Sequence, residues 1–500
     1  MFSLRVRVKL LTSFVLVSML LGFKSLHAQE MLGIVNSSYA GITGSVINPA
    51  VSVTSPFYID INLVAGDIFA ENNYIYLAKE DYRFSRFFSK NPDYPTHGTD
   101  NSMIAYDYYN TRNKKAFASA RLIGPSFAVT VGRHSFGFVT GARVVSSSKN
   151  IPYDIAKFGF ERREFFPQYG VNYADNQKIY NAELAWMENG INYSYVVKQG
   201  GLDYWAAGIT VKDLRGYAGG YVYFDNVDYI VPDPDTLIVH NVNGEAGYSL
   251  PLDYQTNEFI QNPLFRGKGI GIDLGVIYQK KKNEVQNEQI STLCDQQHTP
   301  YQYKIGVSLL DIGRVKFTQN AQKLVLDNVS TTWTEVSGTN YSSVNDFTAL
   351  LSNQFYGNPT EIVKGNEINI VLPTALSAQA DVNYYKNWFI NGTVIIPVHF
   401  SKSGLIRPAL VAVTPRYETS LFDISLPITL YDWTKPRIGL SARFLGFFVG
   451  TEKLGALFHF ADFTGFDFYF GAKISLRKGH CRGKKTGDNC GIEEYKMFKK

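Results

Sequence analysis

The stretch Ser377–Val398, SAQADVNYYKNWFINGTVIIPV, alternates apolar and polar residues on either side of a polar pair, Lys386-Asn387. A period of two around a two-residue polar break is typical of a β-hairpin. Each arm has about 9–11 residues, the length that a tilted strand needs to cross a bilayer. Tyr384 and Trp388 flank the break, where aromatic side chains at a membrane interface would lie. The stretch therefore predicts one hairpin of a transmembrane β-barrel.

Residues 1–28 have the three-part layout of a secretory signal peptide. Arg5, Arg7 and Lys9 precede an apolar run, and the small residue Ala28 stands at the expected cleavage point. The run is too short for a transmembrane helix, and no later segment approaches about 18 consecutive apolar residues. We therefore expect an exported protein that is cleaved after Ala28, and not a helical protein of the inner membrane.

The composition favours a barrel in lipid. The chain has 33 Tyr, 35 Phe and 42 Gly, and charged residues make up only 19%, below the roughly 25% of soluble proteins. The predicted signal carries four of the 49 basic residues and none of the 44 acidic ones, so the mature chain has 45 basic residues against 44 acidic ones. A chain so nearly neutral, without a clustered basic face, predicts no nucleic-acid partner. The alternative is a secreted all-β protein with aromatic-rich sandwiches.

Strand-like alternation recurs from Phe57 to Leu476, and the links between the strands sort by length. Numbered from Phe57, odd-to-even links are mostly long, as in Lys79–Lys115, Ser146–Gln177, Asp225–Phe265 and Thr318–Leu372. Even-to-odd links are mostly short, with Gln279–Pro300 as the exception. Outer-membrane barrels have short periplasmic turns, longer external loops and an even number of strands. We predict an all-β antiparallel barrel of about 14 strands (12–14, depending on Phe447–Phe460) with both termini in the periplasm.

The predicted order is a signal peptide (1–28), an inward plug-like segment (29–56), the barrel (57–476) and a basic periplasmic tail (477–500). The segment after the signal is small, polar and glycine-bearing, without a helix or strand period. Inside the barrel, polar side chains can be solvated or paired. The residues that we expect to face this lumen are Asp60, Asp273, Gln379, Asp381, Asn383, Asp423 and Asp467.

No enzyme site is visible in the sequence. The segment Gly132–Gly137, GRHSFG, has Arg133 where the G-x-S-x-G elbow needs glycine, and it lies in a predicted hairpin turn. The His residues show no metal-ligand spacing. We therefore predict no catalytic residue, cofactor or metal.

The cysteines predict one disulfide. Cys481 and Cys490 lie in the tail, in an oxidising compartment, and a bond between them is the first expectation; a metal pair is the second. Cys294 is then the odd cysteine, expected as a free thiol in a loop. The tail itself is either a short extension without structure or a contact to anionic peptidoglycan or a periplasmic partner.

At Tyr39–Ala50, YAGITGSVINPA, the chain resembles the start of FadL-type long-chain fatty-acid transporters and their relative PorV. In those proteins a plug segment with an Asn-Pro-Ala element precedes a 14-stranded barrel, and the matching residues here are Asn48, Pro49 and Ala50. Three further segments resemble an uncharacterised family of Bacteroidota outer-membrane barrels: KGIGIDLGVIY (Lys268–Tyr278), IGVSLLDIGRVKF (Ile305–Phe317) and GFDFYFGAKISL (Gly465–Leu476). That family has no agreed activity.

The leading functional expectation is passive uptake or binding of a small hydrophobic molecule through a plugged lumen in the outer membrane. Beyond membrane lipid, the expected partner is that ligand. The alternative is a scaffold that joins a secretion or surface-assembly machine, as the PorV resemblance implies. A barrel enzyme such as a lipase is the third reading, and no Ser/His/Asp constellation supports it.

Overall fold

The computed structural model describes residues 30–82, 104–161, 165–175, 178–285 and 293–479. The predicted signal peptide and residues 480–500 lie outside this part of the chain. None of the helices described is long and apolar enough to cross a membrane.

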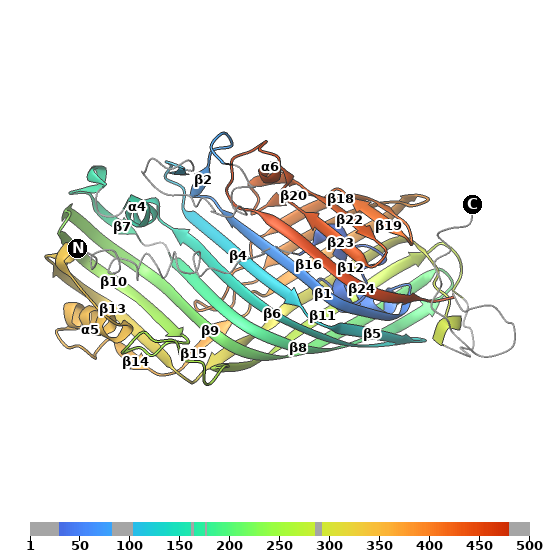
Figure 1. Ribbon diagram of the computed structural model, residues 1–500, viewed down its shortest axis with the longest axis horizontal. Coiled ribbons are helices and arrows are strands. Elements are labelled where there is room, and N and C mark those ends of the chain that lie inside the picture. Colours follow the sequence, from blue (N-terminus) through green and yellow to red (C-terminus); the bar gives the residue numbers. More distant parts are fainter. Residues whose placement is uncertain (1–29, 83–103, 162–164, 176–177, 286–292, 480–500) are drawn as a thin grey trace.

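The strands form one closed antiparallel barrel of 14 strands (Figure 1), as the sequence predicts. Several wall strands are interrupted and carry two labels. In chain order the wall consists of β1 (Phe57–Asn72); β4 and β5 (Lys114–Ile123, Ser126–Val131); β6 (His134–Ile151); β8 (Ile179–Gly200); β9 (Asp203–Asp233); β10 and β11 (Thr236–Ser249, Gly267–Lys281); β12 and β13 (Tyr301–Phe317, Ala321–Trp333); β14, β15 and β16 (Val363–Gly365, Ile368–Val371, Ala375–Tyr385); β17 (Trp388–Pro397); β18 (Leu410–Glu418); β19 and β20 (Phe422–Ser425, Ile428–Tyr431); β21 and β22 (Lys435–Ile438, Leu440–Phe444); β23 (Phe447–Thr451); and β24 (Asp467–Arg477). The last strand pairs with the first, as in Asn62 with Lys473, and closes the ring.

The hairpin predicted from Ser377–Val398 is confirmed as β16 and β17. The two strands pair in register, with Gln379 opposite Thr393 and Asp381 opposite Asn391. The turn is Lys386-Asn387, and Lys386 adopts the left-handed conformation (φ 47°) that tight hairpin turns require. Val382 and Ile390 point outward and are 46% and 45% exposed, as we expect for side chains on the face that lipid would cover.

The two ends of the barrel differ. We call the end with Phe57, Arg477 and the short turns the turn end, and the opposite end the loop end. The loop end carries the small sheet of β2 (Ile75–Leu77) and β3 (Ala105–Asp107), and the helices α4 (Tyr153–Glu161), α5 (Val344–Tyr356) and α6 (Leu454–Leu457) (Figure 1). Strand β7 (Asn172–Asp175) pairs with the far part of β9 there.

Two predicted loops are largely sheet. Asp225–Phe265 holds the end of β9 and all of β10, and Thr318–Leu372 holds β13, α5, β14 and β15. Strand β9 has 31 residues, and at roughly 3.3 Å per residue it is about 100 Å long, far more than the roughly 30 Å of a hydrocarbon core. Beyond the membrane a strand has no lipid-facing apolar row, so the alternation that reveals the other strands is absent there.

Candidate functional site

Residues 30–56 lie inside the barrel at its turn end and form the plug. The plug has three short helical turns: α2 (Leu32–Val35), η1 (Gly41–Val46) and α3 (Val51–Thr54). The side chains of Met31, Leu32, Ile34, Val35 and Ile47 are at most 1% exposed and belong to the main apolar core. The C-terminal end of the plug continues directly into β1 at Phe57, which tethers the plug to the wall.

Wall donors cap the plug's backbone carbonyls. Short helical turns leave carbonyl groups without partners, and burial makes such groups costly. Lys473 Nζ donates to the Ala40 carbonyl (2.8 Å), Ser425 Oγ donates to Gly33 (2.8 Å), and Ser308 Oγ donates to Ile47 (2.6 Å). Each donor comes from a different wall strand, so the plug is held from several sides.

Wall acceptors receive the plug's backbone N–H groups. Leu32 N donates to Glu452 Oε1 (2.7 Å) and Ile42 N donates to Asp60 Oδ2 (2.6 Å). Val53 N donates to Ser194 Oγ (3.1 Å). Carboxylates and hydroxyls of the wall thus accept hydrogen bonds from N–H groups of the plug, and lysine and hydroxyl groups of the wall donate to its carbonyls. These bonds supply the partners that regular secondary structure would otherwise provide within the plug.

The Asn-Pro-Ala element is a contact point between plug and wall. Asn48 Nδ2 donates to Gln379 Oε1 (3.3 Å), and Asn192 Nδ2 of β8 donates to the Pro49 carbonyl (3.1 Å). Ala50 N donates to Asn48 Oδ1 (3.0 Å), which fixes the local turn. Glycines let the wall approach: a β-carbon at Gly208 would lie 2.5 Å from Ala50 N, and one at Gly275 would lie 2.2 Å from Asn48 Oδ1.

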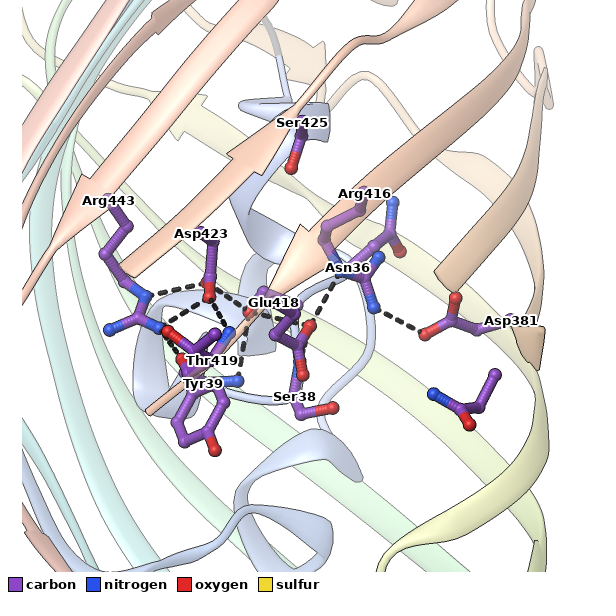
Figure 2. Close-up of polar contacts among 12 residues, drawn as sticks. Asn36, Ser38, Tyr39, Asp381, Arg416, Glu418, Thr419, Asp423, Ser425 and Arg443 are labelled. Atoms are coloured by element: carbon purple, nitrogen blue, oxygen red, sulfur yellow. Dashed lines mark hydrogen bonds and ion pairs between the residues drawn. The ribbon is translucent and has the colours of Figure 1, made fainter. Parts of the chain in front are cut away.

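Beside the plug lies a set of buried ion pairs, which we call the clamp cluster: Asp381, Arg416, Glu418, Asp423 and Arg443 (Figure 2). Arg416 donates to Asp381 (2.9 Å) and to Glu418 (2.7 Å), and Arg443 Nε donates to Asp423 (2.7 Å). The cluster also reaches the plug, because the Ser37 hydroxyl donates to Asp423 (2.8 Å) and Ser38 N donates to Glu418 (3.2 Å). It therefore joins four wall strands to the plug.

A second charged group, the mid-lumen cluster, lies nearer the loop end. Asp311 accepts from Arg143 (2.9 Å), Lys212 (3.0 Å) and Arg407 (3.0 Å), and Lys212 also pairs with Asp273 (2.7 Å). A β-bulge positions Asp311: Ile272 pairs with Ile312 and Leu274 with Leu309, so two residues of β12 face one of β11. Arg407 also lies 3.2 Å from Glu30 at the start of the plug.

Part of the inner wall towards the loop end is apolar, and it lies among buried charges such as Asp67, Glu71 and Arg121. Its buried side chains, which we call the apolar inner wall, are Phe69, Phe117, Leu184, Trp186, Phe317, Ile370 and Leu372. The link 398–409 folds inward against this wall: Leu405 N donates to the Val371 carbonyl (3.0 Å), and Ile406 N donates to Ser147 Oγ (3.1 Å). Val371 and Ser147 lie on the eighth and third wall strands, so this link crosses the lumen.

The remaining predicted lumen residues are spread over the structure. Asp467 is buried and accepts from Glu452 N (2.6 Å), and Gln379 contacts the plug through Asn48. Asn383 is only half-buried at the turn end and accepts from Lys282 (2.6 Å). The sequence reasoning picked out acids and amides and missed their basic partners Arg416, Arg443 and Lys212. These three basic residues occupy inward positions of the same period-two pattern, so the sequence could have identified them as lumen residues. Arg407 lies in a link without any period, and no sequence signal indicates its inward position.

The prediction of a free thiol at Cys294 is wrong. Cys294 is disulfide-bonded and 2% exposed. The predicted bond between Cys481 and Cys490 lies outside the described residues. Among the residues with assigned positions, no group of three or more His, Cys, Asp or Glu side chains is placed to hold a metal ion.

Comparison with known proteins returns one family and several weak structural likenesses. The toluene transporter TodX of P. putida has 8% identity and a TM-score of 0.36, with 87% of this chain and 92% of that chain covered. The CymD monoaromatic hydrocarbon channel has 9% identity and a TM-score of 0.31 (88% and 94% covered), and a Pseudomonas aeruginosa FadL homologue has 10% and 0.26 (87% and 93%). These scores are below 0.5, so the barrel assignment above rests on the strand pairing alone.

No curated protein sequence matches the chain. The alternative of a PorV-like scaffold finds no support in these comparisons. A model described as a family of unknown function, DUF5723, matches residues 49–452. The match begins at Pro49, within the Asn-Pro-Ala element, and ends at the residue after β23, and the chain therefore belongs to the DUF5723 family.

Proposed function

We propose that the protein is a passive transporter of the outer membrane that admits a small hydrophobic molecule, with the plug as its gate. The observation that carries this proposal is the apolar inner wall. Water-filled barrels have polar interiors, whereas the inner wall here combines buried charges with a patch of aromatic and aliphatic side chains, as in Phe117, Trp186 and Phe317. Contact with these side chains is favourable for a hydrophobic molecule, because it removes apolar surface from water, and a hydrated polar molecule gains nothing comparable.

The plug has the properties of a gate. Its described contacts to the wall are hydrogen bonds, ion pairs and apolar packing, and its C-terminal end continues covalently into β1. Each neutral hydrogen bond contributes a net of about 0.5–1.5 kcal/mol, so the bonds can exchange with water one at a time. The plug can therefore move within the lumen without leaving the protein.

A reversible cross-link tests the gate directly. A β-carbon at Gly275 would lie 2.9 Å from Asn48 Cγ, so the β-carbons of an Asn48→Cys, Gly275→Cys variant fall within reach of the roughly 3.5–4.5 Å that a disulfide needs. We expect the oxidised variant to block uptake of a hydrophobic probe into proteoliposomes, and reduction to restore it. The wild-type protein, oxidised and reduced in the same way, controls for the native disulfide. Equal uptake in both states of the variant would contradict the gating role.

Mass spectrometry of the purified protein tests the ligand class. We expect a hydrophobic molecule to co-purify with the wild type and to be lost from a Phe317→Gln variant, which places an amide in the apolar inner wall. Val307→Gln on the lipid-facing side of the same strand, where the side chain is 48% exposed, is the matched control. Deletion of residues 36–54 should raise single-channel conductance in planar bilayers, and an unchanged conductance would exclude the plug as the obstruction.

A further inference from the structure

The link 398–409 between β17 and β18 leaves the wall and reaches the opposite side of the lumen. β17 and β18 are the ninth and tenth of the 14 wall strands, whereas β6 is the third and β8 the fourth. Ile406 N donates to Ser147 Oγ of β6 (3.1 Å). The ring of His399 lies edge-on to that of Tyr180 of β8, with 5.2 Å between the ring centres. In a ring of 14 strands the third lies almost opposite the ninth and tenth, so the link spans the lumen.

The link is built like a lid. It contains no helix or strand, and loops of this length without secondary structure commonly act as lids or binding loops. Its outer part is held by an ion pair between Lys402 and Asp225 of β9, whose side chains are 45% and 27% exposed, and such exposed pairs add little stability. Its middle part is held by Leu405 N, which donates to the Val371 carbonyl (3.0 Å). These contacts can break while every wall strand keeps its neighbours.

Arg407 joins this link to the plug. Its guanidinium donates to Asp311 Oδ2 of β12 (3.0 Å) and lies 3.2 Å from Glu30 Oε1 at the start of the plug. The side chains of Arg407 and Glu30 are 3% and 2% exposed. A buried ion pair adds little over an apolar pair, but separating the partners leaves a buried charge without compensation. Movement of either the link or the plug therefore weakens the position of the other.

The link and the plug together close the lumen. Leu405 is 3% exposed and belongs to the same apolar core as Phe317 of the apolar inner wall. Where the link meets the plug, a cavity of about 10 Å³ is lined by Arg407, Glu30 and Phe117, among others. A space of that size holds at most about one water molecule. A hydrophobic molecule can therefore pass this point only when both segments move.

We propose that residues 398–409 form an inner lid that closes the lumen from the loop end, and that the ion pair of Arg407 with Glu30 couples this lid to the plug. The pair exists only when both segments are closed, so it favours the closed state, and the opening of one segment eases the opening of the other. Such coupling is reciprocal. The proposal rests on the transport role of the plug proposed above and adds a second gate to it.

A reversible disulfide tests whether the inner lid must move. A β-carbon at Gly404 would lie 3.4 Å from Val371 Cβ, close to the roughly 3.5–4.5 Å between the β-carbons of a disulfide. We expect an oxidised Gly404→Cys, Val371→Cys variant to take up no hydrophobic probe into proteoliposomes and to regain uptake on reduction, with wild-type protein treated in the same way as the control. Unchanged uptake here, while the cross-link of Asn48 to Gly275 blocks it, would overturn the inner lid alone. Unchanged uptake with both cross-links would overturn the proposed function as well.

The coupling is tested by labelling one segment while the other is changed. The three native cysteines are replaced by Ser, and one reporter thiol is added at Ser52 of the plug or at Leu405 of the inner lid, which are 2% and 3% exposed. We expect Arg407→Gln to speed maleimide labelling of Ser52→Cys about tenfold, and Glu30→Gln to speed that of Leu405→Cys as much, within the roughly 5–150-fold of typical couplings. The double variant should label no faster than the faster single variant, because both changes break the same pair.

Lys212→Gln is the matched control. Lys212 pairs with Asp311, as Arg407 does, but its other partner is Asp273 of the wall and not the plug. It should leave both labelling rates unchanged, and the gel shift of each barrel on heating in detergent confirms that the variants compared are folded. Effects that add in the double variant, or an equal effect of Lys212→Gln, would show a general loosening of the mid-lumen cluster and overturn the coupling.

Discussion

At the scale of single residues, many of the charges inside this barrel form ion pairs, as in the clamp cluster. Arg416 and Asp381 are both fully buried, and their side chains lie 2.9 Å apart. A buried pair gains little over an apolar pair of the same size, but breaking it by removing one partner leaves an uncompensated charge. The clamp cluster therefore makes the wall next to the plug sensitive to any change that removes one of its members.

We expect Arg416→Met to lower the free energy of unfolding by about 3–5 kcal/mol, because Asp381 and Glu418 lose their shared cation. The measurement is urea unfolding of the barrel in lipid vesicles. Lys316→Met is the matched control, since the pair of Lys316 with Glu367 is exposed (47% and 51%). An exposed pair contributes about 0–1 kcal/mol, and equal losses for the two variants would contradict the role of burial.

His298, which lies just before β12, predicts that the stability of the protein depends on pH in the acid range. Burial, followed by the nearby cations Lys281, Lys478 and Arg477, lowers the pKa of His298 well below its usual 6.5. The folded protein keeps the ring neutral, whereas the unfolded chain takes up a proton below about pH 6.5. Stability should therefore fall on acidification by at most about 1.4 kcal/mol per pH unit below 6.5, until the pH passes the folded pKa.

The unfolding midpoint of the purified barrel, followed from pH 8 to pH 5, measures this effect. A His298→Gln variant should remove that part of the slope because its side chain does not titrate. A slope that is identical in the variant would show that other groups cause the acid sensitivity.

At the scale of elements, the plug and the wall fit each other through close backbone approach. The plug is made of short helical turns that no isolated peptide would hold, since isolated helices of this length are unstable in water. Wall side chains supply its hydrogen-bond partners, and wall glycines such as Gly208 leave room for its backbone. The plug is thus an element that only the closed barrel can stabilise.

Gly208→Ala should displace the plug. The added methyl group would lie 2.5 Å from Ala50 N and 2.6 Å from the Pro49 carbonyl carbon, both backbone atoms that cannot rotate away. Overpacking of this kind costs about 1–3 kcal/mol, and we expect a corresponding rise in the open-channel fraction in planar bilayers. Gly392→Ala on β17 is the control, because its nearest neighbour within range lies 4.0 Å away. Unchanged gating in Gly208→Ala would mean that the plug tolerates the contact.

At the scale of the whole molecule, the barrel is asymmetric along its axis. The plug lies in the half of the barrel next to the turn end, where the last strand β24 also ends, while the long strands β9, β10 and β13 and the helix α5 extend the loop end (Figure 1). Outer-membrane barrels keep short turns in the periplasm and long loops outside. We therefore expect the turn end and the plug to face the periplasm.

Labelling of intact cells tests this orientation. Asp235 lies exposed in the turn between β9 and β10, and Asn387 lies exposed in the turn between β16 and β17. In a background without free thiols, a membrane-impermeant maleimide should label Asp235→Cys on whole cells and Asn387→Cys only after the outer membrane is permeabilised. The reverse labelling pattern would show that the barrel has the opposite orientation in the membrane, with the plug facing the outside.

The sequence by itself determined the transmembrane strands. A strand between lipid and lumen must alternate, so the hairpin of Ser377–Val398 and the last strand, β24, follow from period two. The same reasoning failed where strands leave the membrane, as in β10 and β13, because water replaces lipid there and no apolar row is required.

Only the tertiary structure decided which residues meet inside. Asp60 and Asp423 could be assigned to the inner face from their alternation, but their partners come from other strands of a closed ring and from a plug without any period. The bulge at Asp311 and the inward link with Arg407 bring together residues far apart in the chain. Alternation indicates which face of the sheet a side chain points to, whereas closure of the ring determines which other residues it contacts there.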